Sequence, residues 1–101
     1  MKYPEPFPFK GGEVMIVSLS EAKKYLRVDY DDEDSLIRKF LLTGETLVED
    51  TLRKELKDDK INKVAILYAT AYLFEHREEA DMEELTKSLR YILSTKREVT
   101  F

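Results

Sequence analysis

Residues 61–77 read INKVAILYATAYLFEHR, and this stretch decides the fold. Between Val64 and Phe74, the only polar residue without an aromatic ring is Thr70. A surface helix has an apolar stripe and a charged opposite face, whereas this segment is apolar nearly all round. It is too long for a typical strand, and too short for a bilayer span of about 20 apolar residues. We therefore predict a central helix that the rest of the chain surrounds on several sides.

Three further helices are predicted around this central one. Residues 18–21 (SLSE) have the pattern of a capping box, which starts a short helix ending near Arg27. Apolar residues keep helical spacing from about 32 to 56, which predicts a long second helix. Asp81 and the acids after it predict the start of a fourth helix over residues 82–93. The predicted fold class is all-α: a small four-helix domain with a long second helix, a buried third helix, and extended N- and C-terminal arms.

Gly44 lies in the middle of the long second helix, where a glycine costs up to about 1 kcal/mol relative to alanine. Either a bend at this point or the close crossing of another helix would explain it. Ile37, Leu41 and Val48 share one helical face with Gly44. We therefore expect another helix to cross this face.

The chain is expected to form one domain, because it has only 101 residues. Residues 1–14 are predicted to be an arm rich in proline and aromatic residues, residues 15–97 the helical domain, and residues 98–101 a C-terminal tail. Both Met1 and Met15 could start the chain. The predicted core follows the apolar faces of the last three helices and comprises Leu36, Phe40, Leu41, Val48, Leu52, Val64, Leu67, Tyr68, Ala71, Phe74, Leu85, Leu89 and Ile92.

The two ends carry apolar side chains that no local core can bury. Exposed aromatic residues mark interaction surfaces when they cluster. The alternative for the N-terminal arm is a disordered leader. The candidate interface residues are Tyr3, Phe7, Phe9, Val99 and Phe101.

The sequence has no signature of catalysis, so we predict that the protein is not an enzyme and has no catalytic, cofactor-binding or metal-binding residue. It has no cysteine, which excludes thiolate zinc sites and cysteine nucleophiles. The single histidine, His76, is not part of an H-E-x-x-H motif. A calcium loop starting at Asp29 would need glycine and glutamate where Asp34 and Phe40 stand, so a helix start explains these acids better. A net charge of −4 is unfavourable for binding tightly to DNA phosphates.

Several segments share a family pattern in their order and spacing. Residues 19–29 (LSEAKKYLRVD) are similar to an opening L-x-E-A-K-x-x-L-R-x-D, and residues 32–37 (DEDSLI) to a D-D-x-L-I helix start. Residues 67–78 are similar to the central-helix signature, with His76 where asparagine is common, and residues 89–93 match the final leucine-rich helix. Over about residues 17–97 the chain thus resembles the small head–tail connector (adaptor) proteins of tailed phages and prophages, also described as possible DNA-packaging proteins.

This resemblance implies a structural head-completion protein that forms a ring below the portal, extends the DNA channel and docks the next head–tail joining protein. The implied partners are further copies of the chain, the portal protein, and a head–tail joining or tail-completion protein. The ring would hold about twelve copies in the virion, whereas the oligomeric state in isolation is left open, with a monomer as one alternative. DNA would pass through without tight binding, and no membrane is involved. The implied location is the virion, and the host bacterial cytoplasm during assembly. The alternative is a soluble helical adaptor or regulator that binds one protein partner as a monomer or dimer.

Overall fold

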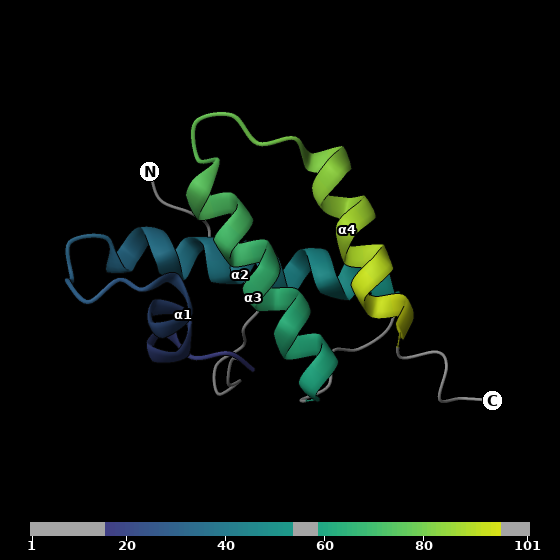
Figure 1. Ribbon diagram of the computed structural model, residues 1–101, viewed down its shortest axis with the longest axis horizontal. Coiled ribbons are helices and arrows are strands. Elements are labelled where there is room, and N and C mark those ends of the chain that lie inside the picture. Colours follow the sequence, from purple (N-terminus) through teal and green to yellow (C-terminus); the bar gives the residue numbers. More distant parts are fainter. Residues whose placement is uncertain (1–15, 54–58, 96–101) are drawn as a thin grey trace.

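The computed structural model describes residues 16–53 and 59–95, and these form four helices in the predicted order (Figure 1). The helices are α1 (Leu19–Leu26), α2 (Asp34–Leu52), α3 (Lys60–Glu75) and α4 (Met82–Ser94). No residue in these two ranges lies in a strand, and the all-α fold class is confirmed.

The predicted end of the second helix near residue 56 is wrong, because α2 ends at Leu52. Arg53 follows in the left-handed conformation, with φ 61°, and its backbone N–H donates to the carbonyl of Glu49 at 2.9 Å. A residue in this conformation closes a helix and turns the chain away from the helix axis. The amphipathic pattern continues beyond this point in the sequence, so hydrophobic spacing alone did not reveal where α2 ends.

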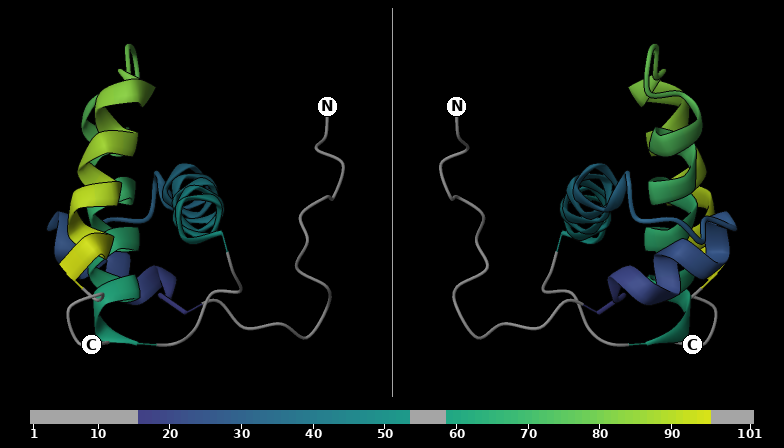
Figure 2. Two further views of the ribbon diagram at one scale, coloured as in Figure 1. Left: turned by 90° about the vertical axis from the view of Figure 1, so that its right-hand side faces the viewer. Right: turned by 90° about the vertical axis from the view of Figure 1, so that its left-hand side faces the viewer.

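The central position of α3 organises the four helices, because α3 contacts α1, α2 and α4. Figure 1 shows α3 crossing in front of α2, with α4 at its side, and Figure 2 shows α2 on one side of the domain and α3 with α4 on the other. The C-terminal end of α1 reaches the layer of α3 and α4 (Figure 2). The inner side of α3 therefore faces α2, and its outer side faces away from α2.

The predicted crossing at Gly44 is present, and α3 is the crossing helix. A Cβ atom built on Gly44 would lie 3.3 Å from the Cβ of Ala69, 3.3 Å from the Oγ1 of Thr70 and 3.4 Å from the carbonyl oxygen of Ile66. The helix backbones come this close only because position 44 has no side chain. The face of α2 that meets α3 and its neighbours is buried at Ile37, Leu41, Gly44, Glu45 and Val48.

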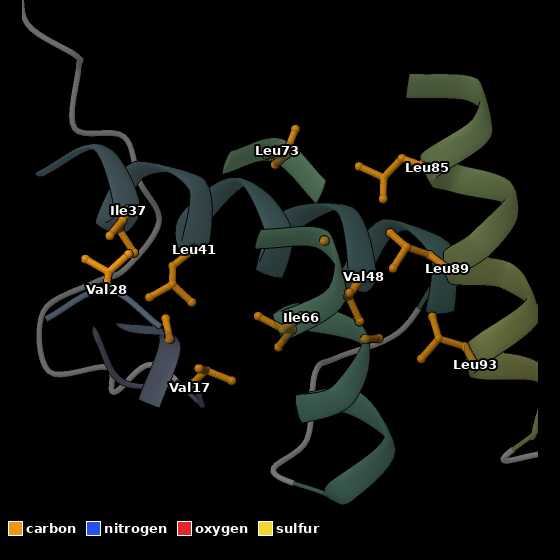
Figure 3. Close-up of a cluster of buried hydrophobic side chains, with 13 residues drawn as sticks. Val17, Val28, Ile37, Leu41, Val48, Ile66, Leu73, Leu85, Leu89 and Leu93 are labelled. Atoms are coloured by element: carbon orange, nitrogen blue, oxygen red, sulfur yellow. The ribbon is translucent and has the colours of Figure 1, made fainter. Parts of the chain in front are cut away.

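The core lies between α2 and the other three helices (Figure 3). Among the predicted core residues, Leu41, Val48, Leu85 and Leu89 are buried. Others are partly buried and pack against the buried cluster, namely Phe40, Leu52, Leu67, Tyr68, Phe74 and Ile92. Leu36 and Ala71 are also only partly buried. Fully buried residues that were not predicted include Val17, Ala22, Ala65, Ile66 and Ala69.

The assignment of Val64 to the core is wrong, because its exposed fraction is 47%. The buried face of α3 carries Ala65, Ile66, Ala69 and Leu73, and the crossing at Gly44 turns this face towards α2. Val64 lies on the opposite side of the helix, where no described element covers it. The apolar outer side of α3 is thus left partly open to solvent.

Side-chain caps fix three of the helix starts. At α1 the predicted capping box forms: the Glu21 N–H donates to Ser18 Oγ at 3.1 Å, and the Ser18 N–H donates to Glu21 Oε1 at 3.0 Å. Asp59 caps α3 by accepting the N–H of Asn62 at 2.9 Å. Asp81 caps α4, as predicted, by accepting the N–H groups of residues 83 and 84. Each cap satisfies backbone donors that the helix itself leaves unpaired.

Replacing Ser18 by alanine is expected to lower the free energy of unfolding by about 0.5–2 kcal/mol, because the Glu21 N–H loses its acceptor. Ser20→Ala, two residues away in the exposed part of α1, is the matched control and should cost nothing. Urea denaturation followed by circular dichroism measures both. Equal stabilities for the two variants would contradict the cap.

The same cap makes stability depend on pH. The Ser18 backbone N–H bonded to the Glu21 carboxylate holds the pKa of Glu21 below its ordinary value. The stabilisation is therefore complete above about pH 5 and is lost as the pH falls from about 4 through the lowered pKa of the folded protein. The stability difference between the parent and Glu21→Gln should shrink over that window.

Candidate interaction surfaces

The described residues offer no catalytic constellation around the single histidine. His76 lies at the C-terminus of α3, with its Nδ1 atom 3.0 Å from the carbonyl oxygen of Tyr72 and its ring stacked on the Tyr72 ring at 4.1 Å. Residues 16–53 and 59–95 contain no group of three or more His, Cys, Asp or Glu side chains that could hold a metal ion. In the same ranges, no helix combines the length and the apolar character needed to cross a bilayer. The described domain does have hollows on its surface, and two of these are candidate interaction surfaces.

The first surface is a groove on the outer side of α3, which we call the α3 groove. It encloses about 560 Å³ between the C-terminal end of α1, the outer side of α3 and the first turn of α4. Among the residues that line the groove, Ala71 is the smallest. Tyr25, on the α1 side of the groove, is 51% exposed. The lining of the groove comprises Tyr25, Leu26, Tyr68, Ala71, Tyr72, Glu75, His76 and Glu84.

Hydrogen bonds to α4 hold two of the tyrosines in the α3 groove. The hydroxyl of Tyr72 accepts the N–H of Asp81 at 3.0 Å, and the hydroxyl of Tyr68 donates to Ser88 Oγ at 3.4 Å. The rings are therefore fixed before any partner arrives, which lowers the entropic cost of binding. The charged side chains of the lining are two exposed carboxylates, Glu75 and Glu84. Tyrosine rings and carboxylates together suit a partner with apolar and cationic side chains.

The second surface is on the outer side of α2, and we call it the α2 surface. It borders a hollow of about 760 Å³ and comprises Ser35, Leu36, Arg38, Lys39, Leu42, Thr43, Thr46 and Leu47. The hydroxyls of Thr43 and Thr46 donate to carbonyls one turn earlier in α2, both at 3.0 Å, so they are already satisfied within the helix. The charged side chains of the α2 surface are two cations, Arg38 and Lys39. The α2 surface is thus apolar and basic, whereas the α3 groove is aromatic and acidic and exposes slightly more polar than apolar surface.

Ion pairs fix α1, and with it one wall of the α3 groove. Lys23 Nζ lies 2.8 Å from Asp31 Oδ1 and 2.6 Å from Asp34 Oδ1, which joins α1 to the start of α2. The hydrogen bond to Asp31, and then that to Asp34, raises the pKa of Lys23, and Lys23 lowers the pKa of Asp31. Lys63 on α3 lies 3.5 Å from Glu21 on α1. These contacts orient α1 so that its last turn borders the groove.

A buried carboxylate holds the chain just before α1. Glu45 is 7% exposed and accepts the backbone N–H of Ile16 at 3.1 Å. Glu45 is next to Gly44, so the chain that leads into α1 is tied to α2 beside the crossing with α3. No sequence signal marked this residue, because a single glutamate on a charged helix is normally solvated.

None of the predicted interface residues belongs to the described part of the chain. Tyr3, Phe7, Phe9, Val99 and Phe101 all lie outside the described residues. The two surfaces found here were not predicted, although the all-round apolar character of residues 61–77 was a signal for one of them. A helix that is apolar on every side and buried on only one leaves an apolar face for a partner.

A comparison with protein families matches the described domain. The model of a family described as "Phage gp6-like head-tail connector protein" matches residues 16–99, a range that includes all four helices and both surfaces. The chain belongs to this family. Membership implies a structural role in head–tail joining, with portal and tail proteins as partners, and a place in the virion; such connectors are generally not enzymes. No curated protein and no solved structure matches this connector.

Proposed function

We propose that this connector forms a ring of about twelve copies below the portal of the filled capsid, where it extends the DNA channel and docks the next head–tail joining protein. The observation that carries this proposal is the family match over residues 16–99, which covers the whole described domain. The net charge of −4 supports it as well. A conduit should let DNA slide through, and an acidic protein repels phosphates where a basic one would retain them.

We further propose that at least one chain end contacts another subunit or a neighbouring layer of the virion. Tyr3, Phe7 and Phe9 precede the four helices, and Val99 and Phe101 follow them. Apolar side chains at such positions suit a contact made on assembly.

The test adds the purified connector to portal-bearing heads that lack it, with heads that lack the portal as the control. We expect addition only to the portal-bearing heads, and a ring of density below the portal in negative-stain class averages. A connector that stays free with both kinds of head would contradict the ring. A 1:1 complex with a single soluble protein would instead support the adaptor alternative.

The same assay tests the chain ends. Variants that lack residues 1–13 or 98–101 should keep the helical circular dichroism of the parent, because neither deletion removes part of a described helix. One of the two should fail to add to portal-bearing heads. Full addition by both variants would show that the ends are dispensable for ring formation.

A further inference from the structure

We propose that the α3 groove of one copy receives the α2 surface of the next copy. This inference rests on the ring proposed above, and it assigns the ring contact to two named surfaces. The occupant of the groove is therefore a second copy of the chain, docked head to tail.

The position of the two surfaces supports a contact that repeats. Figure 2 shows α2 and α3 on opposite sides of the domain, and the two surfaces lie on the outer sides of these helices. When one copy uses its α2 surface, its own α3 groove stays open for a further copy. Contacts of this kind continue from subunit to subunit and close into a ring when the rotation between copies permits.

Both surfaces bring apolar side chains that their own domain leaves partly uncovered. On α3, Val64 is 47% exposed on the outer side, and Leu67 is half-buried. The α2 surface contributes three half-buried leucines, Leu36, Leu42 and Leu47. The α3 groove is a hollow between helices, whereas the α2 surface lies along one helix. A helix docked in a groove between other helices is a recurrent mode of protein recognition.

Charge selects the head-to-tail arrangement over a symmetric dimer. The α3 groove carries Glu75 and Glu84, whereas the α2 surface carries Arg38 and also Lys39, which has an interaction within its own chain as well. Two α3 grooves face to face would bring carboxylates together, and two α2 surfaces would bring cations together. Like charges across an interface are costly, whereas opposite charges steer the partners together. Complementary charge therefore favours the pairing of one surface with the other.

The absence of native cysteine makes disulfide cross-linking a clean test. Thr43→Cys places a thiol on the α2 surface, and Val64→Cys places one on the outer side of α3; both positions are exposed. Under mild oxidation, the double variant should form a ladder of multimers on a non-reducing gel. In an equimolar mixture of the two single variants, the heterodimer should exceed each homodimer by about tenfold, because docking holds the two thiols at high effective concentration.

A matched control and a charge swap sharpen the test. Thr43→Cys mixed with Arg90→Cys, an exposed position on α4 outside both surfaces, should show no preference for the heterodimer. Adding Arg38→Glu to the Thr43→Cys chain should weaken the cross-link, and adding Glu84→Arg to the Val64→Cys chain should restore it. All variants should first show the circular dichroism of the parent.

Three results would overturn the inference: equal cross-linking in the control mixture, stronger homodimers than heterodimers, or monomers at every protein concentration. The addition assay with portal-bearing heads separates this outcome from failure of the proposed function. Ring formation on heads without the expected cross-link would leave the function standing and reject the assigned surfaces. The expected cross-link without addition to heads would keep the self-contact and reject the role below the portal.

Discussion

Replacing Ile66 by alanine is expected to lower the free energy of unfolding by about 2–5 kcal/mol, the range for emptying a buried aliphatic site. Ile66 is fully buried on the inner side of α3, and its carbonyl oxygen lies at the crossing with Gly44. Little room exists for the helices to collapse into the space, because their backbones already meet there. A domain of this size is stable by only about 5–15 kcal/mol, so the loss is a large fraction of the total. Urea denaturation of the purified variant measures it.

Leu67→Ala is the matched comparison for Ile66→Ala. It removes the same number of carbon atoms from the next residue of the same helix, but Leu67 is only half-buried. We expect a clearly smaller loss of stability, because part of this side chain is already in water. A loss equal to that of Ile66→Ala would mean that the outer side of α3 is covered even in the isolated protein.

Replacing Gly44 by valine is expected to destabilise the protein by about 1–3 kcal/mol, the usual cost of overpacking a core. The Cβ atom alone would lie 3.3 Å from both Ala69 Cβ and Thr70 Oγ1, and valine adds two methyl groups beyond it. The gain from removing a glycine in a helix is at most about 1 kcal/mol, so the steric cost outweighs it. Thermal or urea unfolding of the variant measures the net effect.

A second-site change tests whether the crossing is the cause. Ala69→Gly removes the methyl group that the new side chain would meet, so the double variant Gly44→Val with Ala69→Gly should recover part of the lost stability. Because the two residues are in contact, the stability changes of the two single variants should not sum to that of the double variant. A Gly44→Val protein as stable as the parent would show that α2 and α3 do not approach as closely as described.

The sequence by itself determined the number of helices, their order and most of their starts. These depend on local signals: the capping box at Ser18, the Asp81 cap, and the unbroken apolar run of residues 61–77. The close crossing at Gly44 was also predicted, because a glycine in the middle of a long helix needs a reason and its neighbours on one face are apolar. The resemblance to the family rested on four short segments in the right order.

Only the tertiary structure decided which side of α3 is buried and which is left for a partner. A helix that is apolar all round has no periodic signal to mark its inner face. The approach of α2 at Gly44 turns Ala65, Ile66 and Ala69 inwards and leaves Val64 outside. The α3 groove likewise combines residues from α1, α3 and α4 that are far apart in the sequence. The reason is physical: local propensity sets where a helix starts, but long-range packing between helices sets its rotation about its own axis.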